Sequence, residues 1–204
     1  MDSLDNLAKL FARFPGIGER QSRRFVYFLL GADEQYRSSL AKQITSLRAH
    51  IVQCPSCYVY FEGAAKSMCS VCVNPKVNLK SLLVIEKDAD YLSVKKTKLF
   101  DGRMFLFGGL VPIVEKDTRS NIRIDELIST IKNRATSEGL EEVVLGFSLT
   151  PQGAHTDQYV REQLAKAWTD SPVRISSLGR GLSTGTEIEY SDSETLKSAL
   201  ANRK

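Results

Sequence analysis

The chain has 204 residues, of which 42% are hydrophobic and 25% are charged, and its formal net charge is +4. This length allows one large domain or two small ones, and this composition is ordinary for a soluble globular protein. No apolar run approaches the roughly 20 residues that a membrane span needs, and the N-terminus has no signal-peptide pattern. We therefore expect a cytoplasmic protein that makes no membrane contact.

The first 50 residues predict a small unit of three helices. Hydrophobic residues recur at helical spacing in the first helix, at Leu4, Leu7, Leu10, Phe11 and Phe14. A second helix is expected over residues 19–30, and its inward face should carry Phe25, Phe28 and Leu29. The third helix reaches about His50, and its apolar markers are Tyr36, Leu40, Ile44 and Leu47. A unit of this size cannot enclose a large core.

A Pro-Gly-Ile-Gly turn lies between the first two helices and is flanked by four arginines against a single acid. In a helix-hairpin-helix unit, the glycines of such a turn let backbone N–H groups approach a nucleic-acid phosphate, and the next helix presents its N-terminus to the same phosphate. A plain interhelical turn would explain the glycines but not the arginines. We therefore predict sequence-independent DNA binding by Gly16, Ile17, Gly18, Arg20 and Arg24, with Ile17 pointing inward to fasten the turn.

All four cysteines fall in two C-x2-C pairs that are separated by 11 residues: Cys54, Cys57, Cys69 and Cys72. Each pair can aim two sulfur atoms at one point, and two pairs complete the tetrahedral thiolate cage of a structural zinc ion. A redox C-x-x-C motif would usually occur once, and a disulfide framework would scatter its cysteines. We predict one structural Zn²⁺ per chain, and we interpret the nearby His50 as an ordinary surface residue.

Strands and helices alternate after the cysteines. Apolar strands are expected at residues 82–85, 104–107, 143–147 and 173–177. Helices are expected at residues 90–98, 124–131, 156–168 and 194–203. This alternation indicates an α/β fold with a parallel sheet covered by helices. The predicted parts are a helix-hairpin-helix unit, a four-cysteine zinc knuckle, an α/β body and a C-terminal segment with a helix, with bounds at residues 1–52, 53–77, 78–178 and 179–204.

This order of parts resembles the bacterial recombination proteins of the RecR family, and the likeness covers nearly the whole chain. It is sharpest at the cysteine pairs, at FPGIGERQSRRF (residues 14–25) and at RGLSTGTEIEYSDSETL (residues 180–196), while VIEKDAD and FGGLVP also fit. The resemblance implies a Toprim-type α/β domain and a homotetrameric ring that encircles DNA. It also implies action with RecO and RecF in RecBC-independent recombinational repair of DNA damage, without catalysis, and a subunit contact through the C-terminal signature.

Three departures make the chain a divergent member of that family. Where Toprim folds of the family carry E-G-E after a threonine, this chain has Thr-Pro-Gln-Gly-Ala at residues 150–154. Lys95 replaces a glutamate that usually precedes Lys-Thr, and residues 114–117 replace a glycine-rich turn. Contacts that the family makes through the Toprim face are therefore the hardest to carry over to this chain.

The alternative function is a magnesium-dependent Toprim enzyme that acts on nucleic-acid phosphodiesters. Such chemistry needs several carboxylates around the metal. Glu86 ends the first strand, with Asp88 and Asp90 close behind, but the second acidic cluster is missing and Asp90 can instead cap its helix. We therefore expect a non-enzymatic DNA-binding scaffold with no catalytic residue, which leaves room for a weak Mg²⁺ site near Glu86. His155 is expected in the altered loop, and Trp168 in the core instead of on a base-stacking platform.

Overall fold

The computed structural model describes residues 3–63, 67–114, 122–179, 181–182, 185, 187–191 and 193–201. The chain divides into two compact units, Met1–Ile51 and Val52–Lys204. The finer division into four parts stays a prediction. Among the residues described, no helix combines the length and the apolar character that crossing a bilayer requires.

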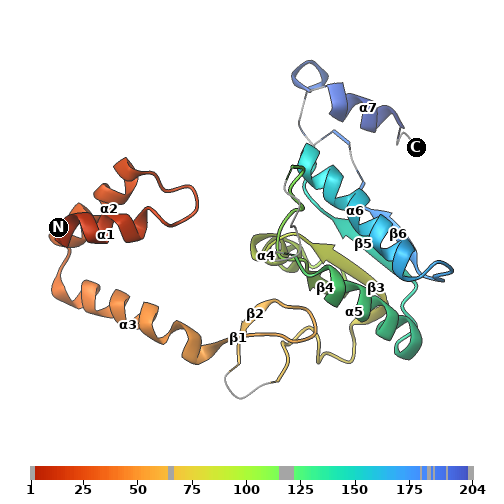
Figure 1. Ribbon diagram of the computed structural model, residues 1–204, viewed down its shortest axis with the longest axis horizontal. Coiled ribbons are helices and arrows are strands. Elements are labelled where there is room, and N and C mark those ends of the chain that lie inside the picture. Colours follow the sequence, from red (N-terminus) through yellow and green to blue (C-terminus); the bar gives the residue numbers. More distant parts are fainter. Residues whose placement is uncertain are drawn as a thin grey trace. The chain divides into compact units, whose positions relative to one another are not determined.

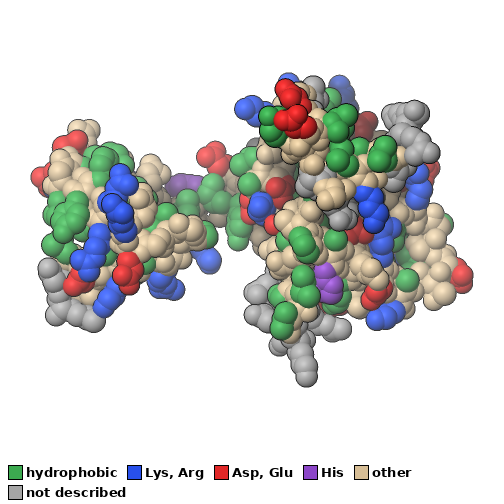
Figure 2. All heavy atoms as spheres, turned by 90° about the horizontal axis from the view of Figure 1, so that it is seen from above, with side chains coloured by type: hydrophobic (Ala, Val, Ile, Leu, Met, Phe, Trp, Pro, Cys, Tyr) green, Lys and Arg blue, Asp and Glu red, His purple; other side chains and the backbone are tan. Residues whose placement is uncertain are grey.

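The N-terminal unit consists of the three predicted helices, α1 (Ser3–Phe11), α2 (Glu19–Gly31) and α3 (Glu34–His50) (Figure 1). Two details of the prediction are wrong. Phe14 lies beyond the end of α1 and is 54% exposed, and Phe28 is 62% exposed instead of facing inward. The buried positions of α2 are Ser22 and Val26, because α1 covers only that side of the helix. Figure 2 shows the consequence: hydrophobic and basic side chains lie interleaved on the surface of this unit.

Arginine and aspartate side chains fix the corner between α2 and α3. The Asp33 carboxylate caps α3 by accepting a hydrogen bond from the backbone N–H of Tyr36 at 2.7 Å. Arg37 donates to the carbonyl oxygens of Leu29 and Ala32 at the end of α2. These bonds satisfy carbonyl groups that a helix end leaves without partners. His50, at the end of α3, is exposed as expected.

The second unit contains a four-stranded sheet with the order β4-β3-β5-β6, and every pair of neighbours is parallel. Its strands are β3 (Asn78–Ile85), β4 (Gly102–Leu106), β5 (Glu142–Gly146) and β6 (Arg174–Ser177). The parallel sheet confirms the predicted fold class. β3 begins earlier than expected, because the polar part of the strand before Leu82 carries an irregular register that an apolar pattern does not mark.

Helices cover both faces of this sheet: α4 (Asp88–Thr97), α5 (Ile124–Ser137) and α6 (Pro151–Ala167). Side chains alternate between the faces along each strand. On one face, Leu82, Val84, Phe105, Val143 and Leu145 belong to the core shared with α5 and α6. On the other face, Leu83, Ile85, Met104 and Leu106 pack with Tyr91 of α4 and with the cysteines. A 3-10 turn (Ile188–Tyr190) and α7 (Ser193–Ala201) follow β6.

The helix α6 begins at Pro151, five residues before the predicted start. Thr150 is its N-cap and accepts a hydrogen bond from the backbone N–H of Gly153 at 3.1 Å, and proline suits the first helical position. The loop predicted here is therefore wrong. His155 lies in α6, and its side chain is exposed. The helix includes it because a threonine cap followed by proline starts a helix here, although the apolar pattern is missing.

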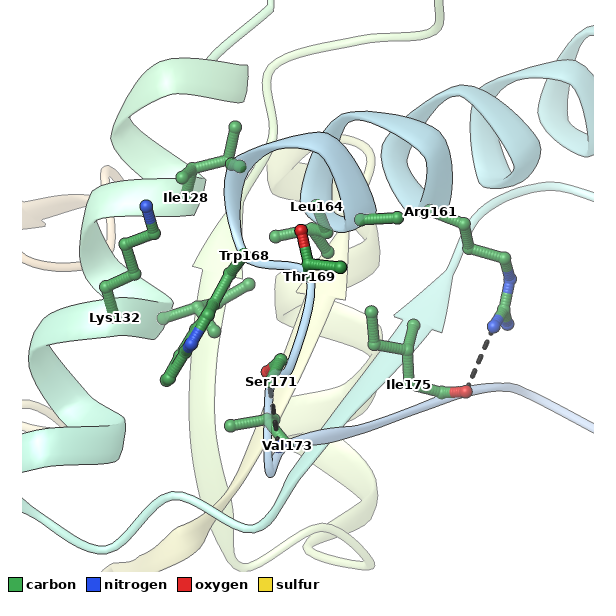
Figure 3. Close-up of a pocket in the computed structure, with 12 residues that line it drawn as sticks. Ile128, Lys132, Arg161, Leu164, Trp168, Thr169, Ser171, Val173 and Ile175 are labelled. Atoms are coloured by element: carbon green, nitrogen blue, oxygen red, sulfur yellow. Dashed lines mark hydrogen bonds between the residues drawn. The ribbon is translucent and has the colours of Figure 1, made fainter.

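A cavity of about 180 Å³ lies between α5, α6 and the beginning of β6 (Figure 3). Trp168, the residue that follows α6, lines it together with Ile128, Leu164 and Val173. Trp168 is partly buried and packs against the main core. This agrees with its interpretation as a core residue.

Candidate metal centre and nucleic-acid interface

The cysteine knuckle is built on two short strands that pair with each other, β1 (Ile51–Gln53) and β2 (Tyr60–Glu62). In the turn between them the backbone N–H of Tyr58 donates to the carbonyl oxygen of Cys54 at 2.8 Å, and Tyr58 has a positive φ of 63°. In the second pair the backbone N–H of Val73 donates to the carbonyl oxygen of Cys69 at 3.2 Å. Strands of three residues are too short for a sequence pattern to mark.

The structure brings the four predicted ligands together. The sulfur atoms of Cys54, Cys57, Cys69 and Cys72 all lie within 4.8 Å of one another, and each of these side chains is buried. Four sulfurs at about 2.3 Å from one tetrahedral ion would lie roughly 3.8 Å apart. Within the described part of the chain, this is the one group of three or more Cys, His, Asp or Glu residues placed to hold a metal ion.

The electrostatics of the cluster also fit a cation. Hydrogen bonds with Cys69 and Cys72, together with burial, raise the pKa of the Cys57 thiol. Hydrogen bonds from Cys57 and Cys72 lower the pKa of Cys69. Buried sulfurs this close cannot all ionise unless a positive charge lies among them. A bound divalent cation would supply that charge and hold the thiolates in one place.

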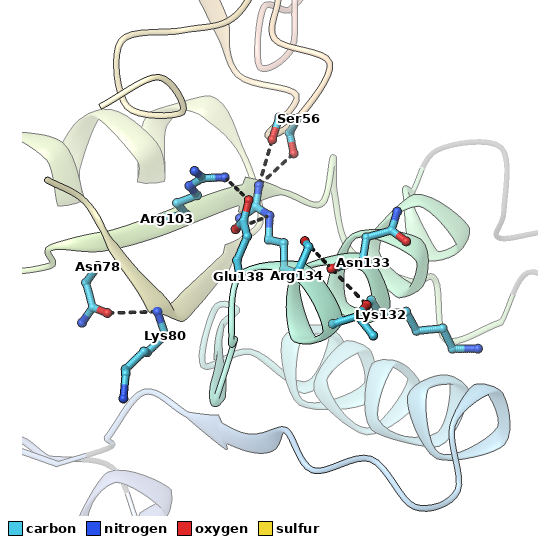
Figure 4. A network of polar contacts seen from close by, with 10 residues as sticks. Ser56, Asn78, Lys80, Arg103, Lys132, Asn133, Arg134 and Glu138 are labelled. Carbon is cyan, nitrogen blue, oxygen red and sulfur yellow. Dashed lines mark hydrogen bonds and ion pairs between the residues drawn. The ribbon is translucent and has the colours of Figure 1, made fainter. Parts of the chain in front are cut away.

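A buried polar network joins the knuckle to the α/β body (Figure 4). Arg134 of α5 is only 5% exposed, and its Nη2 donates to the Ser56 hydroxyl at 2.9 Å. Glu138 lies 3.9 Å from Arg134 Nε and accepts a hydrogen bond from Arg103 at 3.0 Å. Burial lowers the pKa of Arg134, which nevertheless remains a cation. Its helical spacing from Leu127 and Ile131, on the apolar face of α5, is the sequence signal that could have identified it.

The glycine turn in the N-terminal unit leaves its backbone accessible. Gly16 has φ +77°, which favours glycine, whereas Gly18 has φ −85°, which suits any residue. A Cβ atom at either position would meet no other heavy atom within 4 Å. Ile17 is partly buried, as predicted, and its N–H donates to the carbonyl oxygen of Phe14 at 3.1 Å. Neither strain nor crowding within the chain therefore requires a glycine at residue 18.

The arginines near this turn lie in two different environments. Arg23 pairs with Asp5 of α1 at 3.2 Å, across the contact between the two helices. Arg20 and Arg24 lie one turn apart on α2, and both are exposed. Arg24 Nη1 donates a long hydrogen bond to the Gln21 side chain, at 3.4 Å. The structure thus places both arginines of the predicted DNA site on the solvent side of α2.

The Toprim acids do not gather around a common point. Glu86 directly follows β3, which has β4 on one side and β5 on the other, and this is the usual position of a ligand site in open α/β sheets. Its carboxylate lies 3.7 Å from Lys87 Nζ. Asp90 accepts a hydrogen bond from the backbone N–H of Lys87 at 3.1 Å, so it takes part in capping α4, although the N-cap is Lys87 and not Asp90 as expected. After β5, the Ser148 and Thr150 hydroxyls contact each other at 3.1 Å where a second acid pair would be needed.

Comparisons with known proteins find one family model and a set of relatives that are similar to this chain. Residues 181–204 match the family model described as "RecR, C-terminal". A "Recombination protein RecR" from Erythrobacter litoralis is 31% identical over 202 residues, which cover 98% of this chain and 96% of that protein. One from Dehalococcoides mccartyi is 32% identical over 201 residues, which cover 98% and 91%. Residue 180 and several others of the C-terminal signature, and residues 115–117 of the replaced turn, lie outside the described residues.

Proposed function

The chain belongs to the RecR family of recombination proteins and acts in recombinational DNA repair, and we propose that it does so as a non-enzymatic scaffold that binds DNA without reading its sequence. The observation that carries the proposal is the open backbone at Gly18. Its conformation would suit any residue and a side chain there would meet no neighbour, so the glycine is best explained by a group outside the chain that approaches the backbone closely.

A phosphate is the group that fits this position. Gly18 is the N-cap of α2, and having no side chain it makes no capping hydrogen bond to the first N–H groups of that helix. Those N–H groups and the positive end of the helix dipole form a binding site for one phosphate oxygen. Arg20 and Arg24 would contact neighbouring phosphates. Contacts of this kind position DNA but carry no sequence information.

We propose zinc as the ion of the knuckle. Four buried thiolates leave no open coordination position, which suits a structural zinc ion and not a catalytic one. The ion would hold together two separate turns of the chain, and it would therefore contribute directly to folding.

We also propose that the protein assembles into a homo-oligomer through an aliphatic groove of the N-terminal unit, lined among others by Leu7, Leu10, Val26, Leu30 and Ile44. The groove has a volume of about 760 Å³. Leu10, Leu30 and Ile44 are 56%, 60% and 63% exposed. Apolar surface of this extent usually marks a site of association. A second copy would cover it, which supports the ring-like tetramer around DNA that the family resemblance implies.

We propose that the protein acts together with RecO and RecF, in a RecBC-independent route of recombinational repair. In this proposal the C-terminal segment, residues 179–204, supplies a second subunit contact. The protein would work in the cytoplasm, where a bacterial chromosome lies.

The experiment that tests the proposal removes Arg20 and Arg24 together. The double alanine variant should bind duplex DNA more weakly, and each lost phosphate contact should reduce the slope of log affinity against log salt by about 0.9. The matched control removes Lys95 and Lys96 from α4, which lowers the net charge equally. Unchanged affinity in the arginine variant at two salt concentrations would reduce the glycine turn to a structural connection. Equal weakening in both variants would show that net charge alone binds DNA.

A further inference from the structure

A second groove of the N-terminal unit lies beside the proposed phosphate site. This aromatic groove is lined by Gln21, Arg24, Phe25, Phe28 and Tyr36, and its volume is about 440 Å³. It differs from the aliphatic groove in being lined by the Phe28–Tyr36 ring pair and by the carboxamide of Gln21. It lies within one helical unit, between α2 and α3, with Phe11 of α1 contributing to its lining.

The aromatic rings of this groove are exposed. Phe28 is 62% exposed and Tyr36 is 45% exposed, and their ring centroids are 5.9 Å apart in an edge-to-face arrangement. An edge-to-face pair leaves a ring face open to a further flat group. Below them Phe25 packs edge-to-face with Phe11 at 5.6 Å, which supports the floor of the groove. The groove therefore offers flat apolar surface on a supported base.

The groove continues the line of the proposed phosphate contacts. Arg20, Arg24 and Phe28 follow one another at intervals of four residues along α2, so they form one stripe. Each interval advances about 6 Å along the helix axis. A strand whose phosphates contact Gly18, Arg20 and Arg24 would thus carry its bases past Phe28.

We propose that the aromatic groove binds unstacked bases of single-stranded DNA while the glycine turn and the arginines hold its phosphates. The proposal rests on the proposed function and specifies the form of DNA. Aromatic walls with a basic rim are the usual means of holding single strands without sequence preference, because every base has a π face. Bases of an intact duplex are paired and stacked, and they cannot enter the groove. The Gln21 carboxamide can donate to and accept from a base edge.

Charge argues against a second copy of the chain as the occupant. Two copies related by a two-fold axis would present the same groove to each other. Arg24 would then face the identical arginine of the other copy, and like charges in a closed contact are unfavourable. A polyanionic strand instead finds Arg24 at the rim and flat surfaces inside.

The experiment uses the full-length protein and three DNA probes: a thymidine oligonucleotide, the same strand with abasic residues in place of the bases, and a duplex. The wild type should bind the base-containing strand roughly tenfold more tightly than the abasic strand. The double variant Phe28→Leu/Tyr36→Leu should lose this preference, while its affinity for the abasic strand and for the duplex stays unchanged. Fluorescence quenching of a 2-aminopurine base should fall in parallel.

Tyr27→Leu is the matched control, because Tyr27 lies on the same helix, is 61% exposed and is not part of the groove. This variant should keep the preference for the base-containing strand. An equal loss of that preference in this control would show that the groove is not its cause. A retained preference in the double variant would also overturn the proposal. So would a changed molar mass of the variant in light scattering, since a second copy would then occupy the groove. Removal of Arg20 and Arg24 should weaken binding of all three probes, so failure of the phosphate site is distinguishable from failure of the groove.

Discussion

Replacing Gly18 with aspartate should strengthen the fold of the N-terminal unit and weaken its binding to DNA. Gly18 has the extended backbone, φ −85° and ψ 172°, that N-cap residues usually adopt. A Cβ atom there meets no heavy atom within 4 Å, so the new side chain fits without strain. Its carboxylate can accept a hydrogen bond from the first turn of α2, as Asp33 does for α3.

Two contributions raise the stability. A capping side chain in place of glycine adds about 0.3 kcal/mol to the free energy of unfolding. A negative charge at the positive end of a helix adds about 0.3–1 kcal/mol. In a small domain, a total near 1 kcal/mol raises Tm by roughly 4–8 °C.

The effect on DNA binding has the opposite sign. The carboxylate occupies the N–H groups that the phosphate would use, and it would lie about 4 Å from a phosphate held nearby. Repulsion between unit charges at that distance is about 1–4 kcal/mol, depending on the local dielectric constant. The Kd for DNA should therefore rise by at least about fivefold.

The assay compares Tm and Kd for the wild type, Gly18→Asp and Gly18→Asn. Asparagine has the same size and caps equally well but has no charge, so it should match the gain from capping and lose less affinity. A Gly18→Asp variant that is at least as stable as the wild type and has an unchanged Kd at low salt would refute the phosphate site at this turn.

Three further predictions concern the other sites. Cys57→Ser should lose the metal and lower the thermal stability, because the metal-binding free energy that contributes to folding is lost while the remaining thiols stay buried. Less than half an equivalent of zinc in fresh, reduced wild-type protein would contradict the zinc assignment. Ile44→Asp should lower the molar mass measured by light scattering by placing a charge in the aliphatic groove, whereas Leu99→Asp, at a residue that is 90% exposed, should not; a wild type that is monomeric at micromolar concentration would exclude the oligomer. Glu86→Ala should leave DNA affinity unchanged, because a single carboxylate paired with Lys87 is a poor magnesium site; magnesium-dependent nicking that disappears in this variant would establish the enzyme alternative.

The sequence alone determined the features that depend on short-range spacing. Two C-x2-C pairs predict the cluster of four cysteines that the structure contains, because each pair closes through a turn of a few residues whatever surrounds it. Alternating apolar segments likewise identify the parallel sheet, because strands joined through helices pair in parallel. The glycine turn was found for the same reason, since its conformation lies within four residues.

Which faces are covered depends on packing between elements, and the sequence pattern does not show it. Phe28 has the spacing of a core residue but is exposed, because the buried side of α2, against which α1 packs, is the side of Ser22 and Val26. Arg134 is charged but buried, because Ser56 of the knuckle, from a segment far away in the chain, accepts a hydrogen bond from it, while Glu138 lies one helical turn further along. Helical or strand spacing tells which residues share a face, whereas burial depends on which element packs there, and that is fixed by contacts between segments distant in sequence.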